Sequence, residues 1–221
     1  MQLVDRIEKR RFVGRELLLW LWFESEVFDG TRTTKDHGDV GLWLVRELSL
    51  SSGKEVTRIQ GAAPALGRDA KEALLAGKLP ERASFKVSMG EREAELTIKA
   101  ETLGLSGVRL PTVLDDGDAP APGELGSTAP TRARRRRTTV EEDADRERDE
   151  AALAFQERMS LAREIESLLE GLYAEFLALR LSPRWGSAVV PAMRTWASGG
   201  RVDAARYLRA QGPGARGGRG A

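Results

Sequence analysis

The sequence contains no cysteine and only one histidine, His37. Without cysteine the chain has no disulfide, no thiol nucleophile and no thiolate ligand for a metal. A single imidazole also excludes the paired histidines of many zinc sites. Walker, GxGxxG, GxSxG and HExxH motifs are absent as well. These absences predict a protein without catalytic residues, cofactor or metal, and the lack of disulfides fits a reducing cytoplasm.

Long apolar runs are scarce too. The longest unbroken run, Leu17–Phe23, has seven residues, whereas a helix needs about 20 to cross a bilayer. The N-terminus carries charges of both signs and no apolar signal core, so we expect no secretory signal and no membrane partner. Around the run, Phe12–Glu26 holds good helix formers and no β-branched residue after Val13. This stretch predicts an apolar helix at the centre of the hydrophobic core.

Alternating residues predict a β-hairpin after this helix. Leu42–Leu50 and Glu55–Ile59 supply the two strands, and Ser51–Gly53 supplies the turn between them. A short helix is expected over Arg68–Ala76. Gly77 ends it, because glycine readily adopts the left-handed conformation that follows many helices.

A second hairpin is expected further along the chain. Ser84–Met89 alternates cleanly, and Glu91–Ala100 places Ala94, Leu96 and Ile98 on one face. The opposite face of this hairpin is polar, which predicts a sheet with one side exposed to water. Residues 103–110 then predict an edge strand.

A linker separates this module from the C-terminal part. Residues 112–138 are rich in proline, glycine and charge, so we expect them to be disordered. Thr139 and Glu142 match a capping box and predict the start of a long helix. Gly171 interrupts the expected helix, and Ser182-Pro183 ends it.

Apolar residues at helical spacing predict that the second half of this helix docks on the first module. A helical unit over Gly186–Ala197 and a short basic helix over Val202–Ala210 are expected to follow. The predicted fold is α+β, with an apolar N-terminal helix, antiparallel hairpins with a short helix, a disordered linker, and C-terminal helices that pack back. The predicted domains are the α+β module (1–111), the linker (112–138), the helices (139–198) and a basic, mobile tail (199–221).

The net charge of +1 hides an uneven distribution of charge. Residues 139–182 hold five basic and twelve acidic groups, whereas residues 183–221 hold seven basic groups and one acidic group. Arginine neutralises DNA phosphates and releases counterions, which gives affinity independent of base sequence. Alternatively, the linker arginines pair with the acidic helix inside the molecule. The residues expected to contact DNA are Arg132, Arg134, Arg135, Arg136, Arg137, Arg194, Arg201, Arg206 and Arg209.

Two sets of acidic residues could in principle carry other chemistry. The polar loop Asp29–Asp39 places His37 between two aspartates, but the chain has no second histidine to complete a metal site. Glu91, Glu93 and Glu95 alternate along one strand and could hold Mg²⁺ for phosphodiester cleavage. Both patterns are also typical of solvated surface, and we interpret them so.

Several stretches resemble RdgC-like recombination-associated proteins, in the C-terminal half of that family. The resemblance rests on packing sequence rather than on a catalytic motif. The matching stretches are Phe12–Glu26 (FVGRELLLWLWFESE), Gly77–Pro80, Leu105–Pro111, Leu179–Pro183 and Val190–Met193.

The resemblance implies a non-enzymatic protein of the nucleoid that binds duplex DNA without sequence preference and takes part in recombination and replication. Members of the family form ring-shaped dimers around DNA, so a homodimer is implied as well. The N-terminal half of the family has no counterpart here, so the chain is expected to be a fragment or a freestanding C-terminal relative. The alternative is a helical module for dimerisation or for interaction with another protein.

Overall fold

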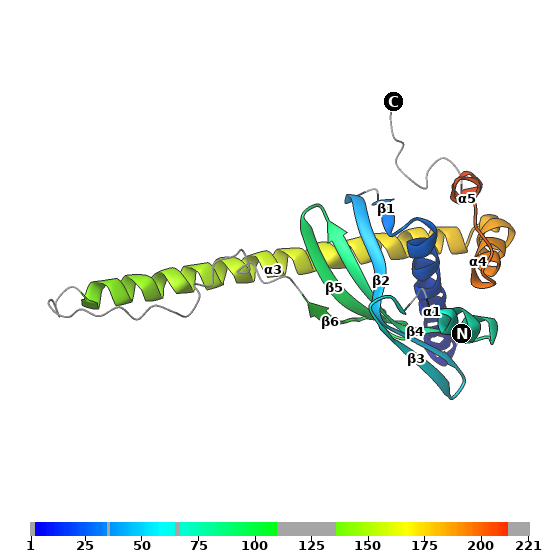
Figure 1. Ribbon diagram of the computed structural model, residues 1–221, viewed down its shortest axis with the longest axis horizontal. Coiled ribbons are helices and arrows are strands. Elements are labelled where there is room, and N and C mark those ends of the chain that lie inside the picture. Colours follow the sequence, from blue (N-terminus) through cyan, green and yellow to red (C-terminus); the bar gives the residue numbers. More distant parts are fainter. Residues whose placement is uncertain (1–2, 35, 65–66, 110–135, 212–221) are drawn as a thin grey trace, which may run out of the picture. The chain divides into compact units, whose positions relative to one another are not determined.

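The structure is a computed structural model, and it describes residues 3–34, 36–64, 67–109 and 136–211. The chain divides into two units, residues 1–110 with 167–221 and residues 111–166. The mixed α+β fold is confirmed (Figure 1). The elements are α1 (Leu3–Val27), β1 (Thr31–Thr34), β2 (Gly38–Ser52), β3 (Glu55–Gly61), α2 (Arg68–Leu75), β4 (Leu79–Met89), β5 (Arg92–Lys99), β6 (Leu105–Arg109), α3 (Arg136–Arg180), a π-helical turn η2 (Trp185–Val189), α4 (Val190–Ala197) and α5 (Ala204–Gln211).

The six strands form one antiparallel sheet. The order is β1-β2-β4-β5-β6, and β3 pairs with the second half of β2 on the side where β1 pairs with the first half. Both predicted hairpins are confirmed, as β2–β3 and β4–β5, and β6 is the edge strand expected near residues 103–110. The turn at Gly53 has a φ of 61°, which glycine adopts without strain.

One strand was missed. The stretch Asp29–Asp39 was predicted as a polar loop, but Thr31–Thr34 pairs with Gly38–Gly41 to form a third hairpin. Its threonines are β-branched and suit a strand, although no apolar residue marks it. Arg32 and Thr34 are buried, so the inward face of β1 is polar.

The core forms around α1, as predicted. Within Leu17–Phe23 every side chain except that of Leu19 is buried. The helix contacts β2 and β4 on one side of the sheet, where Phe85 and Leu96 are buried. Burying one such large apolar side chain stabilises the fold by about 1.5–3 kcal/mol.

The C-terminal helices complete this core through aromatic contacts with α1. The rings of Trp20 and Phe176 have centroids 5.6 Å apart. Trp196 of α4 meets Trp22 edge-on at 4.9 Å and Phe23 at 5.5 Å. The C-terminal helices therefore pack back on the N-terminal module.

Helix α3 differs from its predicted course in two ways. It begins at Arg136, so Thr139 lies inside the helix rather than at its N-cap. It also runs through Gly171 without a break. One helical glycine costs about 1 kcal/mol relative to alanine, which the buried neighbours Leu168 and Leu172 offset. The predicted disordered linker, residues 112–138, lies outside the described residues except for its last three, which belong to α3.

Two glycines inside helices should respond to alanine in opposite directions. At Gly14 an added β-carbon would overlap the backbone carbonyl oxygen of Ala100. Overpacking typically costs about 1–3 kcal/mol, and more where backbone must move, whereas alanine regains about 1 kcal/mol of helix propensity. Gly14→Ala should therefore lower the free energy of unfolding in urea by about 2 kcal/mol.

Gly171 provides the matched control, because a β-carbon added there would meet no atom within 4 Å beyond the nearby backbone of its own helix. Gly171→Ala should raise the free energy of unfolding by about 0.5–1 kcal/mol through helix propensity alone. Equal effects of the two substitutions would contradict the close approach of α1 to Ala100.

Candidate functional site

The C-terminal helical segment, residues 182–211, carries a strong local positive charge. It contains five arginines and a single acidic residue, Asp203. Four of these arginines have exposed side chains and form no ion pair with any other residue that the structure describes. They are Arg184, Arg194, Arg201 and Arg206.

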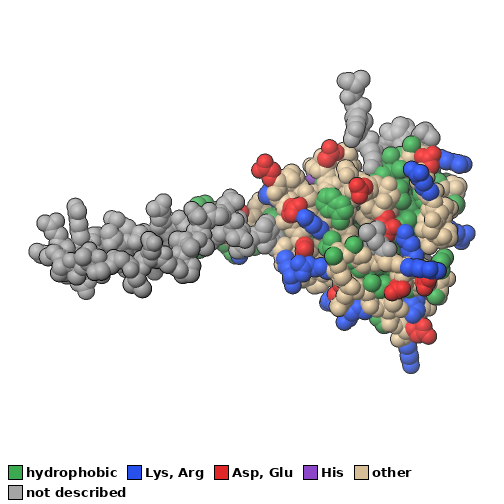
Figure 2. Space-filling model, in the orientation of Figure 1, with side chains coloured by type: hydrophobic (Ala, Val, Ile, Leu, Met, Phe, Trp, Pro, Cys, Tyr) green, Lys and Arg blue, Asp and Glu red, His purple; other side chains and the backbone are tan. Residues whose placement is uncertain are grey.

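Unlike these four arginines, many other lysines and arginines of the first unit pair with an acidic residue. Lys86 pairs with Glu93 at 2.7 Å, and Lys71 pairs with Glu26 at 2.8 Å. Figure 2 shows basic and acidic side chains interspersed over the face in view. Such pairing leaves little net field on the sheet, so the C-terminal helical segment is the more distinctly basic surface.

Aromatic side chains anchor this segment, while its four arginines with described side chains face solvent. Trp185 of η2 meets Phe176 edge-on at 5.5 Å. Tyr207 of α5 is buried against Phe23 at 5.2 Å, and its neighbour Arg206 is exposed. The helical period places adjacent residues on different faces, which explains the division between anchor and arginine.

A half-buried carboxylate, that of Glu26, fixes α4 to α1 and α2. Glu26 accepts hydrogen bonds from the indole nitrogens of Trp22 and Trp196, both at 2.7 Å. Lys71 adds an ion pair to the same carboxylate at 2.8 Å. Three elements therefore meet on one side chain, which sets the position of Arg194 on α4.

A second buried network fixes α5. Arg32 of β1 donates to the carboxylates of Glu24 and Glu175, and its guanidinium lies 4.5 Å from the centre of the Trp20 ring. The hydroxyl of Tyr207 donates to Glu24 at 3.1 Å. Burial alone would lower the pKa of Arg32, but the fields of Glu24 and Glu175 outweigh it and raise this pKa above its ordinary value. Arg32 is therefore permanently charged, and it links β1 to α1 and α3 directly and to α5 through Glu24.

The structure places the predicted DNA-contact residues in different regions. Arg194, Arg201 and Arg206 belong to the C-terminal helical segment, and Arg184 joins them although it was not predicted. Other members of the predicted set are seen only as backbone or lie outside the described residues. Arg209 lies in α5 and Arg136 and Arg137 in α3, with no described side chain, while Arg132, Arg134 and Arg135 lie outside the described residues.

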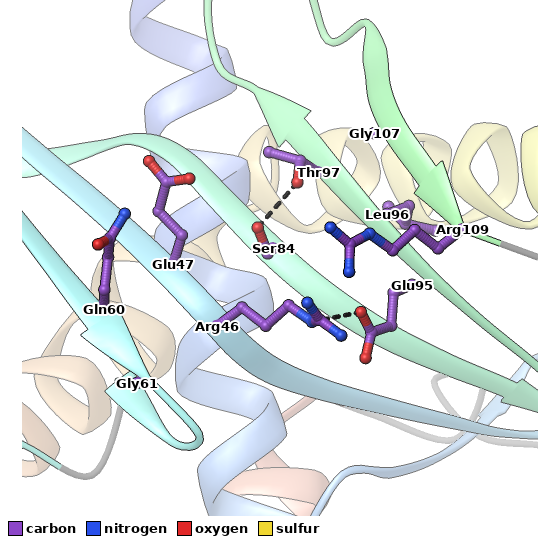
Figure 3. Close-up of a pocket in the computed structure, with 10 residues that line it drawn as sticks. All are labelled: Arg46, Glu47, Gln60, Gly61, Ser84, Glu95, Leu96, Thr97, Gly107 and Arg109. Carbon is purple, nitrogen blue, oxygen red and sulfur yellow. Dashed lines mark hydrogen bonds and ion pairs between the residues drawn. The ribbon is translucent and has the colours of Figure 1, made fainter.

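A polar cleft lies on the sheet face opposite α1, and sequence reasoning missed it (Figure 3). It has a volume of about 450 Å³ and draws on five strands, so no single stretch of sequence reveals it. Ser84 of β4 and Thr97 of β5 share a hydrogen bond of 2.8 Å on its floor. The lining residues are Arg46, Glu47, Gln60, Gly61, Ser84, Glu95, Leu96, Thr97, Gly107 and Arg109.

A β-bulge shapes this cleft. Three residues of β2, from Val45 to Glu47, lie opposite Ser84 alone on β4. The middle residue, Arg46, has a φ of 60°, which is strained for a residue with a side chain. Bulges redirect side chains, and Arg46 here reaches Glu95 at 2.5 Å.

The carboxylates considered for metal chemistry have other partners. Glu93 and Glu95 pair with Lys86 and Arg46, and Asp39 accepts a hydrogen bond from Thr33 at 2.6 Å. Within the described ranges, no group of three histidine or carboxylate side chains is placed to hold a metal ion. Nor is any described helix long and apolar enough to cross a membrane.

Comparisons of the chain with family models, with curated proteins and with solved structures gave no match. Function must therefore be inferred from the chemistry of these two surfaces, the C-terminal helical segment and the cleft.

Proposed function

We propose that this chain is a non-enzymatic protein that binds duplex DNA without sequence preference, as its resemblance to RdgC-like proteins implies. The supporting observation is the C-terminal helical segment, where the guanidinium groups of four exposed arginines form no ion pair with a described residue. A role in recombination or replication follows from the resemblance alone.

These arginines favour phosphate as a partner because their side chains are exposed and form no ion pair with a described residue. Each guanidinium has five N–H donors in a fixed fork that matches two phosphate oxygens. No described ion pair has to break before the contact forms, so the electrostatic gain is not offset by a lost internal pair. Contacts of this kind position a protein on the duplex and carry no base information.

The surroundings also favour a binding role over nuclease activity. Nuclease chemistry with Mg²⁺ needs carboxylates free to ligate the ion. Glu93 and Glu95 are engaged by Lys86 and Arg46. Glu26 and Glu24, which accept hydrogen bonds from Trp196 and Tyr207 of the C-terminal helical segment, hold helices together.

Sequence-independent binding can be tested with two labelled duplexes of equal length and unrelated sequence. We expect dissociation constants that agree within about threefold and lie near 10⁻⁶–10⁻⁴ M at physiological salt. Fluorescence anisotropy measures both, and a neutral polymer of similar size serves as the control. A preference of about a hundredfold or more, typical of specific binding, would contradict the proposal.

A second function, self-association through a helix, is favoured by the part of α3 in the second unit. Phe155 and Met159, four residues apart and therefore on one face of the helix, are exposed there by 64% and 41%. Exposed apolar side chains that lie together often mark interaction surfaces. Light scattering distinguishes this candidate, because a strictly monomeric chain at high concentration would exclude a homodimer.

A further inference from the structure

The cleft on the open sheet face brings two guanidinium groups into one polar space. Figure 3 shows Arg46 entering from β2 and Arg109 from β6, with their guanidinium groups directed toward each other. Arg109 is exposed and forms no ion pair with a described residue. Arg46 has one acidic partner, Glu95, which leaves several of its N–H donors for a ligand.

The strained backbone of Arg46 indicates that the position of its side chain over the cleft is maintained at an energetic cost. A non-glycine residue in the left-handed region is strained, because its β-carbon crowds the backbone. Core packing does not explain it, because the Arg46 side chain is 53% exposed. The bulge instead turns the guanidinium over the cleft, and strained positions of this kind cluster at binding sites.

The floor of the cleft provides a further donor. Ser84 and Thr97 are 2.8 Å apart, and either hydroxyl can donate to the other. Whichever hydroxyl accepts this bond keeps its own proton, so one O–H can be directed at a ligand oxygen. Donors thus come from β2, from β6 and from the β4–β5 floor.

We infer that this cleft binds a phosphate group. Guanidinium forks bind phosphate oxygens bidentately. Donors from three sides suit a tetrahedral anion better than a planar carboxylate. The acidic lining does not oppose this, because Glu47 lies 3.2 Å from Arg58 and Glu95 pairs with Arg46. Glu95 acts as an internal counterion, which the phosphate replaces at Arg46.

The volume of about 450 Å³ exceeds that of bare phosphate and lies in the range of sites for small organic ligands. A phosphate ester of a small molecule therefore fits, and so does one phosphate of a nucleic-acid backbone. The inference goes beyond duplex binding by the C-terminal helical segment, since it uses residues of the sheet.

The test is calorimetric titration of the full chain with inorganic phosphate and with adenosine monophosphate. Arg46→Gly and Arg109→Ala should each weaken binding about tenfold, because each removes a charge-assisted contact. Arg46→Gly also relieves the backbone strain, so it should fold at least as well as the parent. Glu95→Gln should tighten binding, since it removes the competing carboxylate. Lys54→Ala also removes one positive charge, but at an exposed turn outside the cleft, so it should leave binding unchanged.

Two results would overturn the inference: no heat of binding with either ligand at millimolar concentration, or equal binding by the parent and folded Arg46→Gly. Duplex titration of the same variants identifies the source of the phosphate. Unchanged duplex affinity assigns the cleft to a small phosphate ester, and a parallel loss assigns it to the nucleic-acid backbone. Because phosphate binding is measured without DNA, a chain that fails to bind duplex leaves this result intact.

Discussion

Replacing Arg32 with alanine is expected to lower the free energy of unfolding by about 3–5 kcal/mol, since it removes a cation that pairs with the buried carboxylate of Glu24. Glu24 is 5% exposed and accepts hydrogen bonds from both Arg32 and the hydroxyl of Tyr207. The substitution also removes the cation from the face of the Trp20 ring. Small domains are stable by about 5–15 kcal/mol, so the loss is large. Urea unfolding followed by tryptophan fluorescence measures it.

Arg68→Ala is the matched control, because it removes an arginine from a solvent-exposed pair with Glu72. The two side chains are 91% and 57% exposed, and pairs of this kind contribute about 0–1 kcal/mol. If Arg32→Ala costs no more than Arg68→Ala, the network does not hold α1, β1, α3 and α5 together.

The raised pKa of Arg32 also has a consequence for pH dependence. A group whose pKa is raised by folding stabilises the fold below its unfolded-state pKa and loses this contribution as the pH rises through its folded-state pKa. Both values for Arg32 are strongly basic. The contribution of its guanidinium charge should therefore be constant across the neutral range.

The second large effect concerns DNA affinity. Changing Arg184, Arg194, Arg201 and Arg206 together to glutamine should lower duplex affinity by on the order of 10⁴-fold near 50 mM salt, if each contacts one phosphate. The loss arises because four fewer counterions are released on binding. All four side chains are exposed, so the variant should unfold at nearly the parent urea concentration. Anisotropy titration with one labelled duplex measures the change.

A control with the same loss of charge separates local contact from net charge. Changing Lys54, Arg68, Arg92 and Lys99 to glutamine also removes four positive charges, all from exposed side chains outside the C-terminal helical segment and the cleft. This variant should lose far less affinity, because screened charges distant from the duplex contribute weakly. Equal losses would assign binding to net charge rather than to the C-terminal helical segment.

Local pattern was enough to predict much of the fold. The helix-forming composition of Phe12–Glu26 predicted α1, and alternation predicted the β2–β3 and β4–β5 hairpins. The burial of Trp196 followed from its helical spacing with Met193. In each case the signal lies within one element, where period and turn residues indicate the structure directly.

Features that depend on partners distant in sequence were not predictable. Arg32 appeared to be a loop residue, because its burial depends on Glu175, which lies 143 positions away. The bulge at Arg46 has no glycine to mark it, and the cleft needs side chains from five strands. Strand β1 was missed because its buried side chains are polar.

Residue type and position in the sequence also did not identify every exposed arginine of the C-terminal helical segment. The predicted set omitted Arg184, which is isolated in sequence and follows Pro183. Its relevance emerges only once the structure shows that it is exposed and unpaired within the described ranges. Ion pairing is a tertiary property, so charge counts along the chain cannot separate Arg184 from the paired Arg180, which lies 2.6 Å from Glu16.

The most direct test of the central claim is the salt dependence of duplex binding by the parent chain and by the quadruple glutamine variant of the C-terminal helical segment. A plot of log K against log salt concentration should be linear for both proteins, with a slope about 3–4 shallower for the variant than for the parent. Equal slopes for the two proteins would show that these four arginines release no counterions, and would contradict the proposal that they bind DNA phosphates.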